Sequence, residues 1–114
     1  MGILQQRGIK LVKKNFEAKI IKYADTTDWD MIHVSHIRSP EILNEIIENL
    51  DLAIAGRFNE IDNNGVTNSQ DSIAFIEPNG IEYWNQDAQN LYPFTCSLQD
   101  FRELFIEWRN FLRS

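Results

Sequence analysis

The chain has 114 residues, of which 43% are hydrophobic and 25% charged, so it is long enough to form one domain, residues 1–114, around a single core. Its single cysteine, Cys96, excludes an intramolecular disulfide and favours a reducing, cytoplasmic setting. The sequence has no apolar run long enough to span a membrane and no signal-peptide pattern at its N-terminus.

The net charge of −6 is distributed unevenly along the sequence. Residues 1–24 hold six basic residues and one acidic residue, and we expect residues 1–14 to be an extended or partly ordered basic segment. Residues 25–100 hold fourteen acidic and two basic residues. The acidic surface expected for residues 25–100 would repel the phosphates of nucleic acids and attract a basic protein. An acidic surface that only maintains solubility is the alternative.

The first predicted elements form a hairpin. Alternating apolar and polar residues predict a strand over residues 16–24, entered from residues 9–12. The polar residues 25–30 predict a turn, and the β-rich residues 31–37 predict the second strand.

A helix is predicted to follow this hairpin. Ser39 and Pro40 indicate its start, because serine caps free N–H groups and proline suits the first helical position. Gly56 ends or loosens it. Its apolar side chains recur at helical spacing and form one stripe, made of Leu43, Ile46, Ile47, Leu50, Ile54 and Phe58.

The second half of the chain predicts a polar loop and a second hairpin. Residues 59–71 are rich in Asn, Asp and Gly and predict the loop. Residues 72–77 and 81–85 predict two strands, and the Pro-Asn-Gly sequence at 78–80 predicts the tight turn between them.

The C-terminal part predicts an irregular segment and a closing helix. Residues 86–96 show no regular pattern. Ser97 and Asp100 have the spacing of a capping box, and an amphipathic stripe follows them, made of Phe101, Leu104, Phe105, Trp108, Phe111 and Leu112. The resulting order, ββαββα, predicts an α+β fold with two helices packed on one face of an antiparallel sheet.

Two groups of residues raise the question of metal binding. The oxygen-bearing residues of the 60–71 loop follow the positions of an EF-hand, with Glu60 first, Gly65 sixth and Asp71 twelfth. Glu at the first position and Asp at the twelfth depart from that pattern. A calcium-binding or small-ligand-binding module is therefore kept as the alternative function and not as the first one. His33 and His36 would point to opposite faces of the predicted strand, which argues against a shared metal.

Other signs of catalysis are weak. Cys96 has no activating neighbours and is expected to be a buried thiol. The sequence contains no Gly-rich phosphate loop, Ser-centred elbow or zinc spacing, so we expect neither an enzyme nor a cofactor. A small enzyme that uses one of the histidines and a homodimer without a ligand remain further alternatives.

The residues of the late hairpin suggest a binding surface. Strand alternation places Ile81 and Tyr83 toward the core, and Glu82 and Trp84 on the other face. Tryptophan is common at the centre of protein interfaces. A half-exposed Trp84 among carboxylates would therefore suit a basic partner, although it could also pack beneath the 86–96 segment.

Two segments carry a resemblance to a known class of proteins. The hairpin E-P-N-G-I-E-Y-W (77–84) and the helix S-L-Q-D-F-R-E-L-F-I-E-W-R-N-F-L (97–112), in a small acidic α+β chain, resemble the bacterial immunity proteins that neutralise toxin domains, such as those of contact-dependent inhibition systems. The resemblance implies a tight one-to-one complex with a basic toxin domain, often a nuclease, whose active site or substrate surface is covered. This diverse family has no fixed binding positions to transfer.

The predicted partner-binding residues come from the segments expected to be exposed. Acidic side chains would steer a basic toxin domain toward the protein, and aromatic side chains would form the buried centre of the interface. We expect neither nucleic acid nor membrane as a partner. The predicted site consists of Glu60, Asp62 and Asp71 from the loop and Glu77, Glu82, Trp84 and Asp87 from the hairpin.

Overall fold

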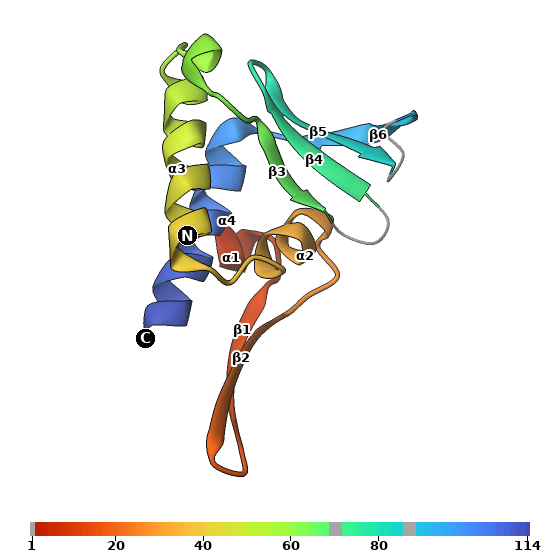
Figure 1. Cartoon of the computed structure of the whole chain (residues 1–114). Helices are drawn as coiled ribbons and strands as arrows, with labels where there is room; N and C mark the ends of the chain where they lie inside the picture. Colours follow the sequence, from red (N-terminus) through yellow and green to blue (C-terminus); the bar gives the residue numbers. More distant parts are fainter. Residues whose placement is uncertain (1, 69–71, 86–88) are drawn as a thin grey trace.

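The computed structural model describes residues 2–68, 72–85 and 89–114, and its fold is α+β, as the sequence predicts (Figure 1). In chain order, the elements are α1 (Ile3–Gln6), β1 (Lys10–Phe16), β2 (Lys19–Asp25), α2 (Trp29–Ser35), α3 (Pro40–Ile54), η1 (Phe58–Glu60), β3 (Gly65–Asn68), β4 (Ser72–Glu77), β5 (Gly80–Asn85), β6 (Leu91–Cys96) and α4 (Leu98–Arg113). Within the described residues, the strands form an antiparallel ribbon, β1-β2, and an antiparallel sheet with the order β3-β4-β5-β6.

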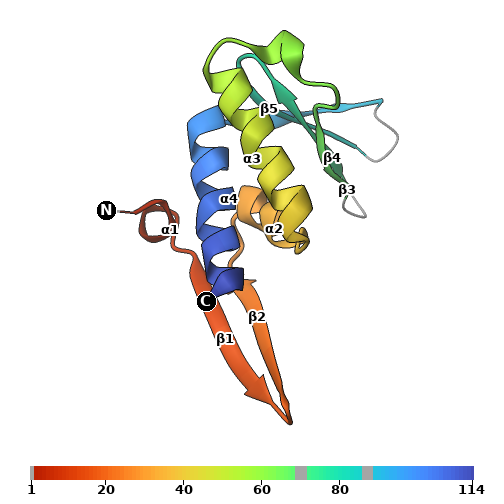
Figure 2. The ribbon, with the colours of Figure 1, turned by 60° about the vertical axis from the view of Figure 1, so that its left-hand side comes forward.

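The ribbon β1-β2 projects away from the rest of the molecule (Figures 1 and 2). A single strand over residues 16–24 was the wrong prediction, because the chain reverses at Glu17 and Ala18 and pairs Phe16 with Lys19. Glu17 has a φ of 54°, a conformation that is uncommon for a residue with a side chain and that sequence patterns assign to Gly or Asn. The reversal therefore carries no sequence signal.

The prediction of a strand over residues 31–37 is also wrong, and these residues do not pair with 16–24. Residues 29–35 form α2 instead. The Asp28 side chain accepts a 2.9 Å hydrogen bond from the backbone N–H of Met31 and so caps this helix. The buried side chains follow helical spacing and are Asp30, Met31, His33 and Val34.

Both long helices are confirmed, with their caps. Ser39 accepts a hydrogen bond from the backbone of Ile42, and Ser97 accepts one from Asp100. Helices α3 and α4 pack against each other and cover one face of the four-stranded sheet (Figure 2). Their buried side chains are Leu43, Ile46, Ile47, Leu50 and Ala53 from α3 and Leu98, Phe101, Leu104, Phe105 and Trp108 from α4.

The N-terminal basic segment 1–14 contains α1 and the start of β1. Ile3 and Ile9 are 5% and 6% exposed and belong to the same hydrophobic core as the long helices. Of the described helices, none is both long enough and apolar enough to cross a lipid bilayer.

The late hairpin is confirmed, with Ile76 opposite Ile81. Two neighbouring segments differ from the prediction. Residues 59–71, predicted as a loop, include the end of η1 and strand β3, and residues 86–96, predicted as irregular, include β6. Pro93 weakens the strand signal of β6, but a proline is tolerated there because β6 is the edge of the sheet.

Gly80 is expected to tolerate a side chain poorly. Its φ is +148°, and an added Cβ would lie 2.9 Å from the carbonyl oxygen of Cys96. We expect Gly80→Ala to lower the free energy of unfolding by about 2 kcal/mol, measured by urea denaturation. Gly56 has a φ of +79° but no atom within 4 Å of the added Cβ, so Gly56→Ala should cost about 1 kcal/mol. Equal losses would contradict the steric argument.

Candidate functional site

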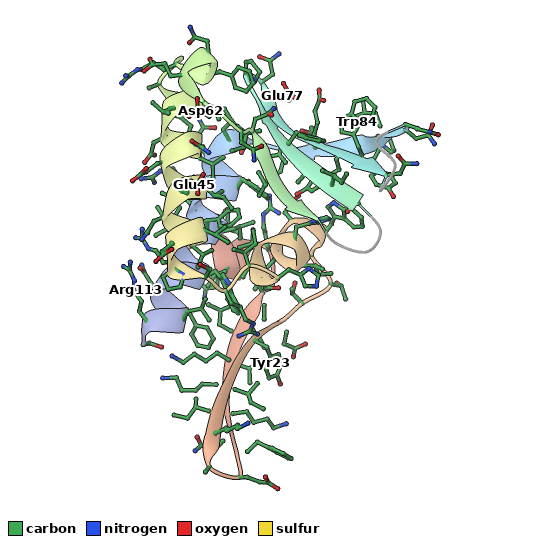
Figure 3. All side chains as sticks on the ribbon, in the orientation of Figure 1. Tyr23, Glu45, Asp62, Glu77, Trp84 and Arg113 are labelled. Atoms are coloured by element: carbon green, nitrogen blue, oxygen red, sulfur yellow. The ribbon has the colours of Figure 1, made fainter. Side chains whose placement is uncertain are left out.

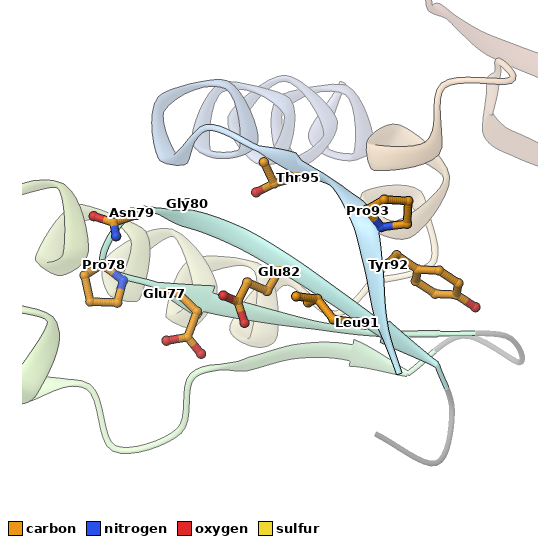
Figure 4. A pocket seen from close by; sticks show the side chains of 9 residues that line it. All are labelled: Glu77, Pro78, Asn79, Gly80, Glu82, Leu91, Tyr92, Pro93 and Thr95. Atoms are coloured by element: carbon orange, nitrogen blue, oxygen red, sulfur yellow. The ribbon is translucent and has the colours of Figure 1, made fainter. Parts of the chain in front are cut away.

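An open groove of about 500 Å³ lies on the side of the sheet that the helices leave uncovered (Figure 4). Strands β4 and β5 alternate, so that Ala74, Ile76, Ile81 and Tyr83 are buried beneath the helices. The side chains between them point outward. The groove is lined by Glu77, Pro78, Asn79, Gly80, Glu82, Leu91, Tyr92, Pro93 and Thr95.

Two carboxylates line this groove from neighbouring strands. Glu77 and Glu82 lie on the same face, since Phe75 is opposite Glu82 and Glu77 is opposite Gly80. Partial burial, followed by repulsion from Glu82, raises the pKa of Glu77 above its usual value. A 3.3 Å hydrogen bond from the amide of Asn64 opposes this rise. A cationic group in the groove would relieve the repulsion between the two carboxylates.

Tyr83 and Trp84 separate to the two faces of the sheet, as predicted. Tyr83 is fully buried, and its hydroxyl donates a hydrogen bond to Asp30. Trp84 is partly exposed, and its indole N–H lies 3.3 Å from a carboxylate oxygen of Glu82 (Figure 3). The Trp84 ring therefore lies on the same face of the sheet as the acidic pair, beside the groove, which we call the acidic groove.

The β6 side of the acidic groove was missed by the sequence analysis. Leu91 is 53% exposed, and Tyr92 and Pro93 line the groove beside it. The six-residue run from Leu91 to Cys96 contains aromatic and β-branched residues, which is a strand signal. The proline concealed it. These residues give the groove an apolar side next to its two carboxylates.

Of the other predicted binding residues, Glu60 and Asp62 do not line the groove. Glu60 is paired with Arg57, with an Oε1–Nη2 distance of 2.7 Å. This exposed pair lowers the pKa of Glu60. Asp62 is exposed in the segment that leads to β3 (Figure 3). Asp71 and Asp87 lie outside the described residues.

The proposed calcium loop is only partly described. Glu60 is held by Arg57, and the amide of Asn64 donates a 2.9 Å hydrogen bond to the carbonyl of Ile76. Within residues 2–68, 72–85 and 89–114, no group of three or more His, Cys, Asp or Glu side chains is placed to hold a metal ion. Calcium binding stays a prediction, because Asp71 is not described.

His33 lies on α2 and His36 follows the end of this helix, so the prediction that both lie on a strand was wrong. His33 is 2% exposed, and its Nε2 lies 2.8 Å from the hydroxyl of Ser72, which is fully buried. Burial lowers the pKa of His33 to about 4, against an opposing attraction from Asp30. His36 is exposed at the end of α2. The His33–Ser72 pair thus lies in the core and not in the groove.

A part-buried ionic cluster surrounds Arg7. Its guanidinium lies 2.7 Å from Asp30, 3.1 Å from Asp28 and 3.1 Å from Asp100. Burial opposes the charge of Arg7, but hydrogen bonds to Asp30 and Asp100 outweigh it and raise the pKa of Arg7. Cys96, predicted to be a buried thiol, is 4% exposed, and burial raises its pKa.

Comparison of the chain with known proteins found no matching family model, no similar curated protein and no similar solved structure.

Proposed function

We propose that this protein is an immunity protein, which binds a basic toxin domain through the acidic groove and thereby covers the toxin's active or substrate-binding surface. The observation that carries the proposal is the pairing of Glu77 and Glu82 beside Trp84 and Leu91 on one open surface. A nuclease domain would be a fitting target, because its phosphate-binding surface is basic.

The groove combines the two parts that such an interface needs. The carboxylates, together with the net charge of −6, would steer a basic domain into contact and pair with its Lys or Arg side chains. Trp84 and Leu91 would be covered in the complex and provide its apolar centre. In this proposal the protein acts in the cytoplasm, by binding alone, without catalysis or a cofactor.

The test first asks whether the adjacent upstream reading frame encodes a protein with a basic, toxin-like C-terminal domain, and then uses that domain in a catalytically inactive form. We expect Glu77→Lys with Glu82→Lys to weaken its binding at least about tenfold at physiological salt, because two attractive contacts become repulsive. Isothermal titration calorimetry gives the affinities. Protection of cells from the active toxin should fall in parallel.

A matched control separates the groove from total charge. Glu45→Lys with Glu48→Lys makes the same change of net charge on exposed positions of α3 (Figure 3). This variant should bind within about threefold of the original protein, because surface charges beyond a Debye length are screened. Equal weakening in both variants, or an adjacent domain that the protein does not bind, would overturn the proposal.

A further inference from the structure

Three arginines converge on a second pocket, where α3 begins and α4 ends. The pocket has a volume of about 290 Å³ and is lined by Arg38, Pro40, Leu43, Arg109, Leu112 and Arg113. Figure 3 places Arg113 at this end of the two helices. We call it the arginine pocket. Among the residues that the structure describes, none lines both this pocket and the acidic groove.

The pairing of the arginines sets this pocket apart from the rest of the surface. The chain has six arginines, and three of them make ion pairs with carboxylates: Arg7, Arg57 and Arg102. No carboxylate of the described residues pairs with the other three, and all three line this pocket. In a chain with seventeen acidic residues, such a grouping of unneutralised guanidinium groups favours an external anion.

Two of the guanidinium groups are held in position. Arg38 lies over the ring of Trp108, at 5.5 Å, and donates a 2.7 Å hydrogen bond to the carbonyl of Lys22. Arg109 donates a 3.1 Å hydrogen bond from Nη1 to the side-chain oxygen of Asn44. Fixed donors lose less conformational entropy when they bind a ligand.

The Nε–H of Arg109 gives the most specific indication. This atom is buried and has no hydrogen-bond partner among the described residues. A buried donor without an acceptor is costly, and an oxyanion in the pocket would supply one. The negative end of the α4 dipole explains why a basic residue, Arg113, stands in the last turn of that helix. It does not explain Arg38, which precedes α3, or the orientation of Arg109.

The surroundings add to the preference for an anion with an apolar part. The pocket lies at the N-terminal end of α3, where the helix dipole favours negative charge, and at the C-terminal end of α4, where the dipole disfavours it, so the attraction for an anion comes from the guanidinium groups. Pro40, Leu43 and Leu112 supply apolar surface next to the guanidinium groups. A ligand that fits both would carry an oxyanion on a small hydrophobic group.

We propose that the arginine pocket binds a small organic oxyanion, a phosphate monoester or a carboxylate, through Arg38, Arg109 and Arg113. This inference is independent of the toxin-binding function, because it concerns other residues on other elements. The two oxyanion types share guanidinium recognition, and the experiment distinguishes between them.

The test titrates the whole protein with phenyl phosphate, benzoate, inorganic phosphate and the neutral benzyl alcohol. Calorimetry gives the affinity, and the NMR signal of the Trp108 indole, beside Arg38, reports the location. We expect phenyl phosphate or benzoate to bind with a dissociation constant of about 1 mM or lower. Benzyl alcohol should not bind, and inorganic phosphate should bind more weakly, because it lacks the apolar contact.

Arginine variants decide whether the pocket is responsible. Arg109→Gln and, separately, the exposed Arg113→Gln should each weaken the anion at least about fivefold, whereas Arg57→Gln, which lies outside the pocket, should not. Arg113→Gln keeps the test valid if Arg109→Gln fails to fold. Equal weakening in Arg57→Gln, or no binding of either organic anion at 10 mM, as a rough upper limit, would overturn the proposal.

Discussion

Replacing Arg7 by glutamine is expected to lower the free energy of unfolding by about 3 kcal/mol. The guanidinium is the shared partner of three carboxylates, and the Asp28 and Asp30 side chains are only 19% and 13% exposed. Removing one partner of a buried ionic group leaves the other charges uncompensated, which costs about 3–5 kcal/mol when burial is complete. The partial exposure of Asp100 keeps the expected loss near the lower end.

Urea denaturation at pH 7 measures this loss, with Arg57→Gln as the control. Arg57 also pairs with a carboxylate, but both side chains are about half exposed, at 58% and 46%. Exposed pairs contribute about 0–1 kcal/mol, so this variant should unfold close to the original midpoint. A similar small loss in Arg7→Gln would show that the cluster around Arg7 does not join the N-terminal segment to the body.

A second large effect is expected from the protonation of His33. Burial holds its pKa at about 4, compared with the usual 6.5, so the unfolded chain binds a proton in the range where the folded protein does not. Above pH 6.5 the titration of His33 therefore does not lower the free energy of unfolding. As the pH falls from 6.5 toward 4, the free energy of unfolding decreases, because the unfolded chain binds a proton and the folded protein does not. The difference between the two pKa values corresponds to about 3 kcal/mol.

His33 on α2 and His36 just after it provide a matched comparison. Unfolding free energies should be measured by urea denaturation at several pH values between 7 and 4 for the original protein, His33→Gln and His36→Gln. The first substitution should flatten the pH dependence between 6.5 and 4, whereas the second, at an exposed position, should leave it nearly unchanged. Parallel curves for all three proteins would contradict a neutral, buried His33.

The elements that the sequence predicted correctly are those with local signals. Helices α3 and α4 begin at serine caps and carry long apolar stripes. The β4-β5 hairpin closes at Pro78-Asn79-Gly80, a sequence that favours a tight turn. In each case, the residues that determine the structure lie within a few positions of one another.

The elements that were missed have weak or misleading local signals. Residues 31–37 have strand-like composition, but α2 forms because its buried side meets β5, where Asp30 accepts a hydrogen bond from Tyr83. There, tertiary packing overrides the local preference. The turn at Glu17 lies at the exposed tip of the ribbon and was missed because its positive φ falls on a residue that is neither glycine nor asparagine.

The candidate site was predictable only in part, for the same reason. Strand alternation within one hairpin was enough to bring Glu82 and Trp84 to one face, and Glu77, which was also predicted, lines the groove with Glu82. Leu91 joins them through the pairing of β6 with β5. The arginine pocket brings together residues more than sixty positions apart, Arg38 and Arg109, so no local sequence pattern predicts it.

The ribbon β1-β2 determines how this protein can be attached to a surface. All five lysines of the 114 residues lie on it: Lys10, Lys13, Lys14, Lys19 and Lys22. Reagents that couple to side-chain amines will therefore react on this projection, at the opposite end of the molecule from the acidic groove (Figure 1). Protein immobilised through these lysines would present the groove outward, without an added tag.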